Sequence, residues 1–302
     1  MYPNFYHLYI DCDFCTCYNP IVIFYRKNMN EVVEPESRNI KIGGGLRSCF
    51  MRLASEVIFY RARRYDIKGQ LERASTLYEQ ALEYNPDNPR VLLNAGLSRC
   101  RLVLKRDDSE ISLEDSFYFV DQAVKFFKRF TEIKPDDAIG FNNLAMARYL
   151  RNKILRRVSL DSNSALITDI EEAIRKDPDN PYILYNKAVL CGYINTAMTD
   201  KSRGVPSIEE ALTILDDVIE MVSQRLDDPL YEELYLHCLS SKEWFLFELM
   251  YDYRIGRYEE EYEEARELFK HKVESRSDWA DRSFWGFSFI LDHGDREPIK
   301  IF

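Results

Sequence analysis

One stretch of this 302-residue chain, residues 62–94, constrains the fold more than any other. Small residues alternate along it with bulky ones at helical spacing. The small residues of each of two helices leave grooves into which the bulky side chains of the other helix can pack. The small residues are Ala62, Gly69, Ala74 and Ala81, and the bulky ones are Tyr65, Leu71, Leu77, Tyr78 and Leu82. The stretch therefore predicts two packed helices and the start of a third.

The segment Asn-Pro-Asp-Asn-Pro at 85–89 separates the second helix from the third. Proline is excluded from helix interiors but suits a first helical turn, so this segment ends one helix and starts the next. Comparable segments occur at 134–137, 177–181 and 227–229. We therefore expect the two-helix unit to recur along the chain.

This spacing resembles the tetratricopeptide repeat (TPR), a helix–turn–helix unit of about 34 residues. The resemblance covers roughly residues 51–272. It implies an all-α fold: a right-handed α-superhelix, or solenoid, of about five TPR-like repeats with a C-terminal capping helix. We expect residues 51–291 to form this repeat domain and residues 292–302 to form a tail.

Five helix pairs account for the repeat region, and the fifth fits least well because Glu261 stands where the other second helices place a small or apolar residue. The expected pairs are 51–67 with 70–84, 91–104 with a helix from 113 to the stop at 134–137, 138–151 with 165–175, 182–194 with 207–226, and 231–255 with 258–272, followed by a capping helix at 279–291.

Extra residues lie between the first and second helices of the second, third and fourth pairs. They form either connectors that emerge on one edge of the superhelix or longer helices, and the sequence leaves both alternatives open.

Residues 1–50 differ in character from the rest. They are rich in Tyr, Phe, Ile and Cys, and Gly43-Gly44-Gly45 reads as a flexible break. We expect this segment to be either disordered or not translated, with Met29 or Met51 as the true start. Mass spectrometry of the endogenous N-terminal peptide tests this, because any peptide upstream of Met29 contradicts it.

The charge distribution limits the kinds of partner that this protein could bind. A net charge of −10 and a pI near 5.1 argue against a nucleic-acid binder, since that affinity comes mainly from neutralising phosphates. Residues 51–106 carry an excess of Arg and Lys, whereas 207–267 are strongly acidic. This pattern indicates either solvated helix faces or a bipolar surface that orients partners.

The seven cysteines and the apolar runs bear on location. Cys100, Cys191 and Cys238 lie in apolar segments with helical periodicity, and we expect them to be buried thiols. Ile21–Tyr25 is too short to span a bilayer, and no charged region of a secretory signal precedes it. We therefore expect a cytoplasmic protein that binds neither membrane nor nucleic acid.

The candidate binding residues follow from one repeated offset. An asparagine stands eight residues beyond each of three helix-ending prolines, giving Asn94, Asn143 and Asn186, with His237 at the matching place in the fifth repeat. Similarity to TPR proteins implies that these amides face a concave groove, where they could bind the backbone of an extended peptide. The alternative is that they hydrogen-bond neighbouring helices.

Other groove-facing positions are apolar or aromatic, as suits a peptide or a helix of a partner. The predicted groove residues besides the three asparagines are Arg90, Asn142, Met146, Tyr149, Tyr182, Tyr185 and Tyr193. A clamp for a C-terminal carboxylate is disfavoured, because Arg63 in the first repeat is followed by Ile139 and Asn143 where further cations are needed.

No enzyme motif occurs around the four histidines. We therefore expect a non-catalytic scaffold or adaptor without a cofactor, binding a protein or peptide partner in the groove. Two alternatives stay open. One is a regulatory subunit that engages a basic partner through the acidic C-terminal half; the other is an N-terminal zinc module with Cys12, Cys15 and Cys17 as weak candidate ligands.

Overall fold

The computed structural model describes residues 44–104, 112–155, 160–197, 208–251 and 256–274. The chain divides into two compact units, Met1–Arg47 and Ser48–Phe302, and residues 44–47 are the described part of the first. The described residues form helices and turns without any strand. The helices are α2 (Gly44–Ile67), α3 (Leu71–Tyr84), α4 (Pro89–Leu104), α5 (Leu113–Ile133), α6 (Ala138–Leu155), α7 (Leu160–Lys176), α8 (Pro181–Ala197), α9 (Ile208–Ser223), α10 (Pro229–Tyr251), the 3₁₀ turn η2 (Gly256–Tyr258) and α11 (Glu259–Glu274).

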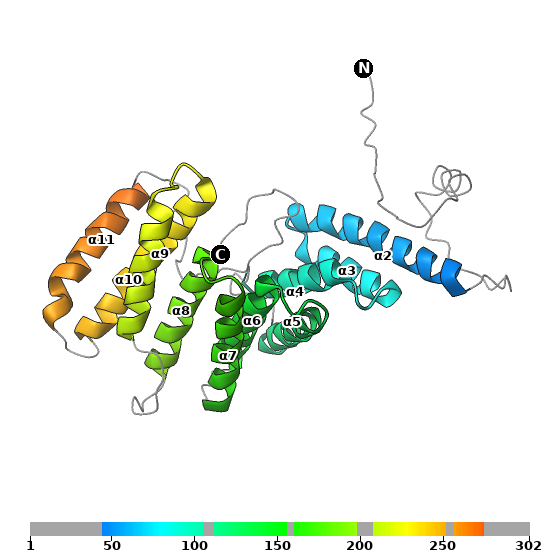
Figure 1. Ribbon diagram of the computed structural model, residues 1–302, viewed down its shortest axis with the longest axis horizontal. Helices are drawn as coiled ribbons and strands as arrows, with labels where there is room; N and C mark the ends of the chain where they lie inside the picture. The colour runs from blue at the N-terminus through cyan, green and yellow to red at the C-terminus, as the bar shows by residue number, and fades with distance from the viewer. Residues whose placement is uncertain (1–43, 105–111, 156–159, 198–207, 252–255, 275–302) are drawn as a thin grey trace, which may run out of the picture. The chain divides into compact units, whose positions relative to one another are not determined.

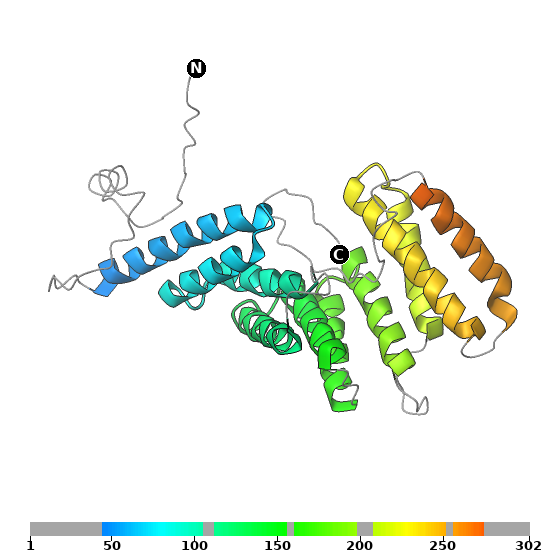
Figure 2. The ribbon, with the colours of Figure 1, turned by 180° about the vertical axis from the view of Figure 1, so that it is seen from behind.

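Each helix from α3 onward packs against the next one in the chain. Figure 1 shows this succession through α11, and Figure 2 shows it from behind. The even-numbered helices α4, α6, α8 and α10 also contact one another in sequence. Each of these is therefore the first helix of a pair, and together they form one continuous face, which we call the first-helix face.

Side-chain caps start the helix after each predicted stop. The Oδ1 atom of Asn88 accepts from the backbone N–H groups of Arg90 and Val91, at 3.1 and 3.4 Å. Asp137, Asn180 and Asp228 make the equivalent contact to the backbone two residues on. Each cap satisfies a backbone donor that has no partner inside its helix, which confirms that these short segments separate the pairs.

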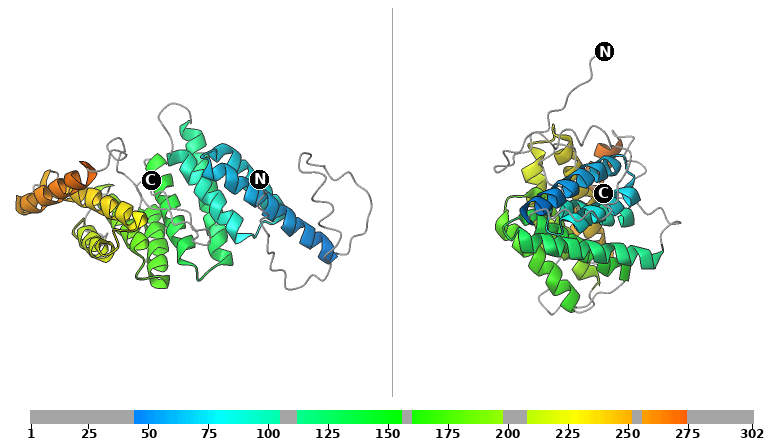
Figure 3. Two further views of the ribbon diagram at one scale, coloured as in Figure 1. Left: turned by 90° about the horizontal axis from the view of Figure 1, so that it is seen from above. Right: turned by 90° about the vertical axis from the view of Figure 1, so that its right-hand side faces the viewer.

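The first helix begins earlier than the sequence indicates. α2 starts at Gly44, ahead of the expected helix start at residue 51, so Gly44 and Gly45 of the expected break lie in its first turn. Glycine lowers helix stability by about 1 kcal/mol relative to alanine, which a 24-residue helix can absorb in its first turn. Gly69 makes the turn to α3 and has φ 69°, a conformation that glycine adopts without strain. Figure 3 shows the helices in two further views.

The small and large positions of the second helices are buried as predicted. Ala74, Tyr78 and Ala81 of α3 have no exposed surface, and the same is true of Ala123 and Phe127 of α5. The corresponding apolar residues of α7 and α9 are likewise inaccessible: Leu166, Ile170 and Ala173, and Ala211, Leu215 and Val218. The same offsets therefore bury the same face in four successive pairs.

Of the three insertions between paired helices, the structure describes enough of the third to choose between the two alternatives. In the third pair α6 and α7 extend to within a few residues of each other, ending at Leu155 and beginning at Leu160. In the second and fourth pairs, residues 105–111 and 198–207 lie outside the described part of the chain. Lengthened helices therefore account for most of the third insertion.

The fifth pair accommodates its unusual glutamate by an ion pair. Lys242 of α10 lies 3.1 Å from a carboxylate oxygen of Glu261 and 2.7 Å from one of Asp216 on α9. Where the other second helices carry a small or apolar residue, α11 thus carries a glutamate that takes part in an ion-pair network joining α9, α10 and α11. The expected capping helix at 279–291 lies outside the described residues.

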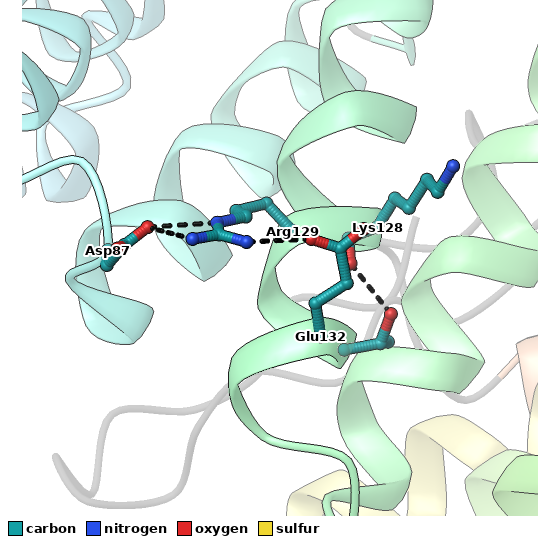
Figure 4. A network of polar contacts seen from close by, with 5 residues as sticks. Asp87, Lys128, Arg129 and Glu132 are labelled. Atoms are coloured by element: carbon teal, nitrogen blue, oxygen red, sulfur yellow. Dashed lines mark hydrogen bonds and ion pairs between the residues drawn. The ribbon is translucent and has the colours of Figure 1, made fainter.

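An exposed ion-pair network joins a turn to a second helix. Arg129 of α5 donates to Asp87 in the α3–α4 turn at 2.9 and 2.7 Å and to Glu132 at 2.9 Å (Figure 4). Figure 4 also shows Lys128 on the same helix, directed away from Asp87. These contacts fix the turn outside the hydrophobic core, where solvent screens ion pairs.

Candidate protein-binding face

The predicted asparagines meet across the first-helix face. Nδ2 of Asn186 on α8 donates to Oδ1 of Asn142 on α6 at 2.8 Å, across 44 positions of sequence. Nδ2 of Asn142 donates in turn to Oδ1 of Asn143 at 3.1 Å. Asn143 and Asn186, which share the same sequence offset, are thus linked through Asn142, the residue that precedes Asn143.

Asn94 on α4 is bonded to the preceding repeat. Its Oδ1 accepts from a guanidinium nitrogen of Arg63 on α2 at 3.3 Å, and its Nδ2 donates to the backbone oxygen of Arg90 at 2.8 Å. The arginine that the sequence offered as part of a carboxylate clamp therefore contacts an amide of the same chain.

Aromatic residues continue the face toward α10. The Tyr185 hydroxyl and Ser241 Oγ are 3.3 Å apart, and the Tyr185 ring lies 6.2 Å from the ring of His237. The Tyr182 and Tyr231 ring centroids are 6.3 Å apart. Burial is the main cause that raises the pKa of both Tyr182 and Tyr185, so neither phenol ionises near neutral pH.

Arg90 differs from the other predicted groove residues in its solvent exposure. The Arg90 side chain is 43% exposed and its guanidinium lies 4.8 Å from the ring centroid of Phe59. The remaining predicted residues with described side chains are buried: Asn94, Asn142, Asn143, Met146, Tyr149, Tyr182, Tyr185 and Asn186. The side chain of Tyr193, on α8, lies outside the described set. The amides hydrogen-bond within the chain, and their contact with a peptide stays a prediction.

Two buried ionic contacts were not foreseen from the sequence. Asp66 of α2 accepts from the Tyr78 hydroxyl at 3.1 Å and pairs with Arg101 of α4. Arg148 of α6 pairs with Asp169 of α7 at 2.6 Å. Helical spacing alone gives no signal for either contact, because both partners look like ordinary surface charges until the helices pack.

Asp169 has a perturbed carboxyl group. Burial raises its pKa to about 6, partly opposed by the adjacent Arg148 guanidinium. The cost of removing the carboxylate from water thus exceeds the benefit of its partner.

The predicted buried thiols are confirmed, whereas the candidate zinc ligands lie outside the part of the chain that the structure describes. Cys100, Cys191 and Cys238 are fully buried thiols, as expected, and burial raises the pKa of Cys191 to about 12. Cys12, Cys15 and Cys17 lie outside the described residues. Within the described part of the chain, no group of three or more His, Cys, Asp or Glu side chains is placed to hold a metal ion.

None of the described helices combines the length and apolar character that crossing a bilayer needs.

The sequence matches the family model described as TPR repeat over residues 62–102. This segment spans the end of α2, all of α3 and most of α4. A search of curated proteins gives no match.

Solved structures are similar over most of the chain at 14% identity. MamA covers 73% of this chain and 97% of its own, with a TM-score of 0.44. YrrB, titled a TPR protein with an unusual peptide-binding site, covers 74% and 86% with a TM-score of 0.40. TTC0263, titled a thermophilic TPR protein in Thermus thermophilus, covers 73% and 99% with a TM-score of 0.42.

The helix–turn–helix unit recognised at 62–102 has the same caps and the same buried offsets as the pairs that follow it. Residues 62–102 therefore match a tetratricopeptide repeat, and the described helices that follow are paired in the same way.

Proposed function

We propose that this protein is a non-catalytic scaffold or adaptor that binds a peptide or helix of a partner protein on its first-helix face. The observation that supports this is the continuity of the face. α4, α6 and α8 contact one another in turn, and Asn186 bonds to Asn142 across two repeats. A continuous face formed by repeated units suits an elongated partner.

Arg90 is the accessible polar anchor in this proposal. Its guanidinium lies over Phe59 and within 5.6 Å of the centroid of the exposed Tyr60 ring. A cation beside aromatic rings can bind a partner's carboxylate or carbonyl groups. The Tyr60 ring can contact the partner's apolar side chains, whereas the Phe59 ring is buried. The buried amides and tyrosines would form the floor beneath this anchor and hold the spacing of the first helices.

The first test separates binding at this face from loss of the fold. Arg90→Glu is compared with Lys128→Glu on α5 by pull-down from native lysate, read by mass spectrometry, with circular dichroism of each variant. We expect both variants to stay folded and Arg90→Glu alone to lose a partner. Equal recovery by the two variants contradicts a role for Arg90.

The second test addresses the amides. Asn143→Ala with Asn186→Ala removes two buried hydrogen-bonding groups, each costing about 1–3 kcal/mol of stability if a partner group is left unsatisfied. If the fold survives and binding is lost, the amides act in recognition as the offsets predict. Unfolding of the double variant, seen by circular dichroism, means that they serve the structure.

A further inference from the structure

The first described helix exposes an apolar stripe. Large side chains recur along one side of α2, where Phe50, Val57, Tyr60 and Ile67 are 51%, 41%, 45% and 59% exposed. The spacings of seven, three and seven residues place all four within one face of a helix. A contiguous exposed apolar stripe of this kind marks an interaction surface.

The charges on this stripe are all positive. Arg61, Arg64 and Lys68 are exposed, and their helical spacing places them on the same side of the helix as the apolar residues. The two acids of α2 point elsewhere: Asp66 is buried and Glu56 is bonded to Asn88. We call the set Phe50, Val57, Tyr60, Arg61, Arg64, Ile67 and Lys68 the α2 outer face.

The charge of this face excludes symmetric pairing with itself. Two α2 outer faces brought together would set three cations against three, and juxtaposed like charges cost several kcal/mol at an interface. The occupant must therefore be acidic. It should also be helical and about 26 Å long, the length of helix from Phe50 to Ile67.

The chain itself contains such an element. α11 has 16 residues, so it is about 24 Å long. Glu260, Glu264 and Glu267 are exposed along one side of it, next to Leu268, which is 41% exposed. We call these four residues the α11 outer face. Within the part of the chain that the structure describes, the ion pairs of α11 involve Glu261 and Glu263 instead of these three glutamates.

We propose that the α2 outer face binds the α11 outer face of a second copy of this protein, so that copies associate head to tail. The two helices are the first and last of the described array, and neither outer face includes a residue of the first-helix face. Tyr60 also lies beside Arg90, but the charge reversals that test association change Arg61, Arg64, Glu264 and Glu267, so this inference can fail without failure of the proposed partner binding. An interface between two different surfaces continues as an open chain unless its rotation closes a ring.

Charge reversal on full-length protein tests this arrangement. One variant carries Arg61→Glu with Arg64→Glu, and a second carries Glu264→Arg with Glu267→Arg. A matched control carries Lys128→Glu with Lys134→Glu, which reverses two exposed cations of the second repeat. Sedimentation velocity is measured over a range of protein concentrations at about 0.1 M and about 1 M salt, where the screening length falls from about 10 to about 3 Å. Circular dichroism verifies that each variant is folded.

We expect the sedimentation coefficient of the wild type and the control to rise with concentration at low salt and to lose this dependence at high salt. Each reversed variant alone should sediment as a monomer, because its two outer faces then carry the same sign. An equimolar mixture of the two reversed variants should associate again, since each supplies the face that the other has lost.

Three results overturn the proposal. The first is a wild type that stays monomeric at every concentration, including the case in which it binds an unrelated acidic amphipathic peptide through Arg61 and Arg64. The second is association of either reversed variant to the extent of the wild type. The third is a mixture of the two variants that remains monomeric although both are folded.

Discussion

Buried charges on the helix–helix contacts show how single residues of this protein depend on their neighbours. Asp66 and Asp169 each sit between two helices, and each is held by an arginine of the facing helix, Arg101 and Arg148 respectively. Removing one member of such a pair leaves the other charge buried without compensation, which destabilises the protein.

Asp169 makes stability depend on pH in a predictable direction. Its folded pKa, about 6, is above the ordinary aspartate value of 3.8, so the folded chain holds more protons between these two values. The contribution of this group to the free energy of unfolding is therefore fully present below about pH 4 and is lost as the pH rises through about 6.

Asp169→Asn removes this dependence. From about pH 4 to pH 7 we expect the variant to gain up to about 3 kcal/mol in unfolding free energy relative to the wild type. Urea denaturation of both proteins at several pH values measures the difference. A difference between them that is constant across this range contradicts the raised pKa.

At the scale of helices, close approach depends on three glycines that face phenylalanine rings. A Cβ atom on Gly96 of α4 would lie 2.6 Å from the Phe127 ring of α5. On Gly140 and Gly192 it would lie 2.5 and 2.1 Å from the rings of Phe130 and Phe245. These rings fill the space that a glycine leaves on the facing helix, which lets helices pack closely both within a pair and between neighbouring pairs.

Gly96→Ala should destabilise the protein by about 1–3 kcal/mol, because the added methyl group forces the buried Phe127 ring to move. The matched control is Gly256→Ala, where a Cβ atom would meet nothing within 4 Å. Thermal melting compares the two. Equal melting temperatures would mean that the α4–α5 contact adjusts to the methyl group without cost.

At the scale of the whole repeat array, stability is distributed along the chain. A large core cluster runs from Leu92 to Ala265, and a smaller one joins Phe59, Ala62 and Tyr78 to the start of α4. Each helix contacts mainly its neighbours in sequence, so an end helix is held from one side and a central helix from two.

Hydrogen exchange should therefore be slowest in α4 to α8 and faster in α2 and α11. The central helices open only when contacts on both sides are lost, whereas an end helix opens after the loss of one. Mass spectrometry of peptic fragments measures this order. Uniform protection from α2 to α11 would show that the array unfolds as a single cooperative unit instead.

Equal sequence offsets placed Asn94, Asn143 and Asn186 in equivalent helices, α4, α6 and α8. Their role in binding stays a prediction. The sequence did not indicate that Asn142 and Asn186 bond to each other, nor that Arg90 is the accessible member of the set. Exposure depends on every helix packed around a position, and residues far along the chain supply those helices.

The sequence by itself determined the helix pairs, because the signals for them are local. Proline is excluded from helix interiors and suits a first turn, an Asn or Asp just before a helix caps it, and small and large residues at helical spacing define the buried face. The tertiary structure decided which polar residues became buried contacts. Whether Asp169 faces Arg148 or water depends on the rotation and crossing of whole helices, and no local pattern of residues fixes these.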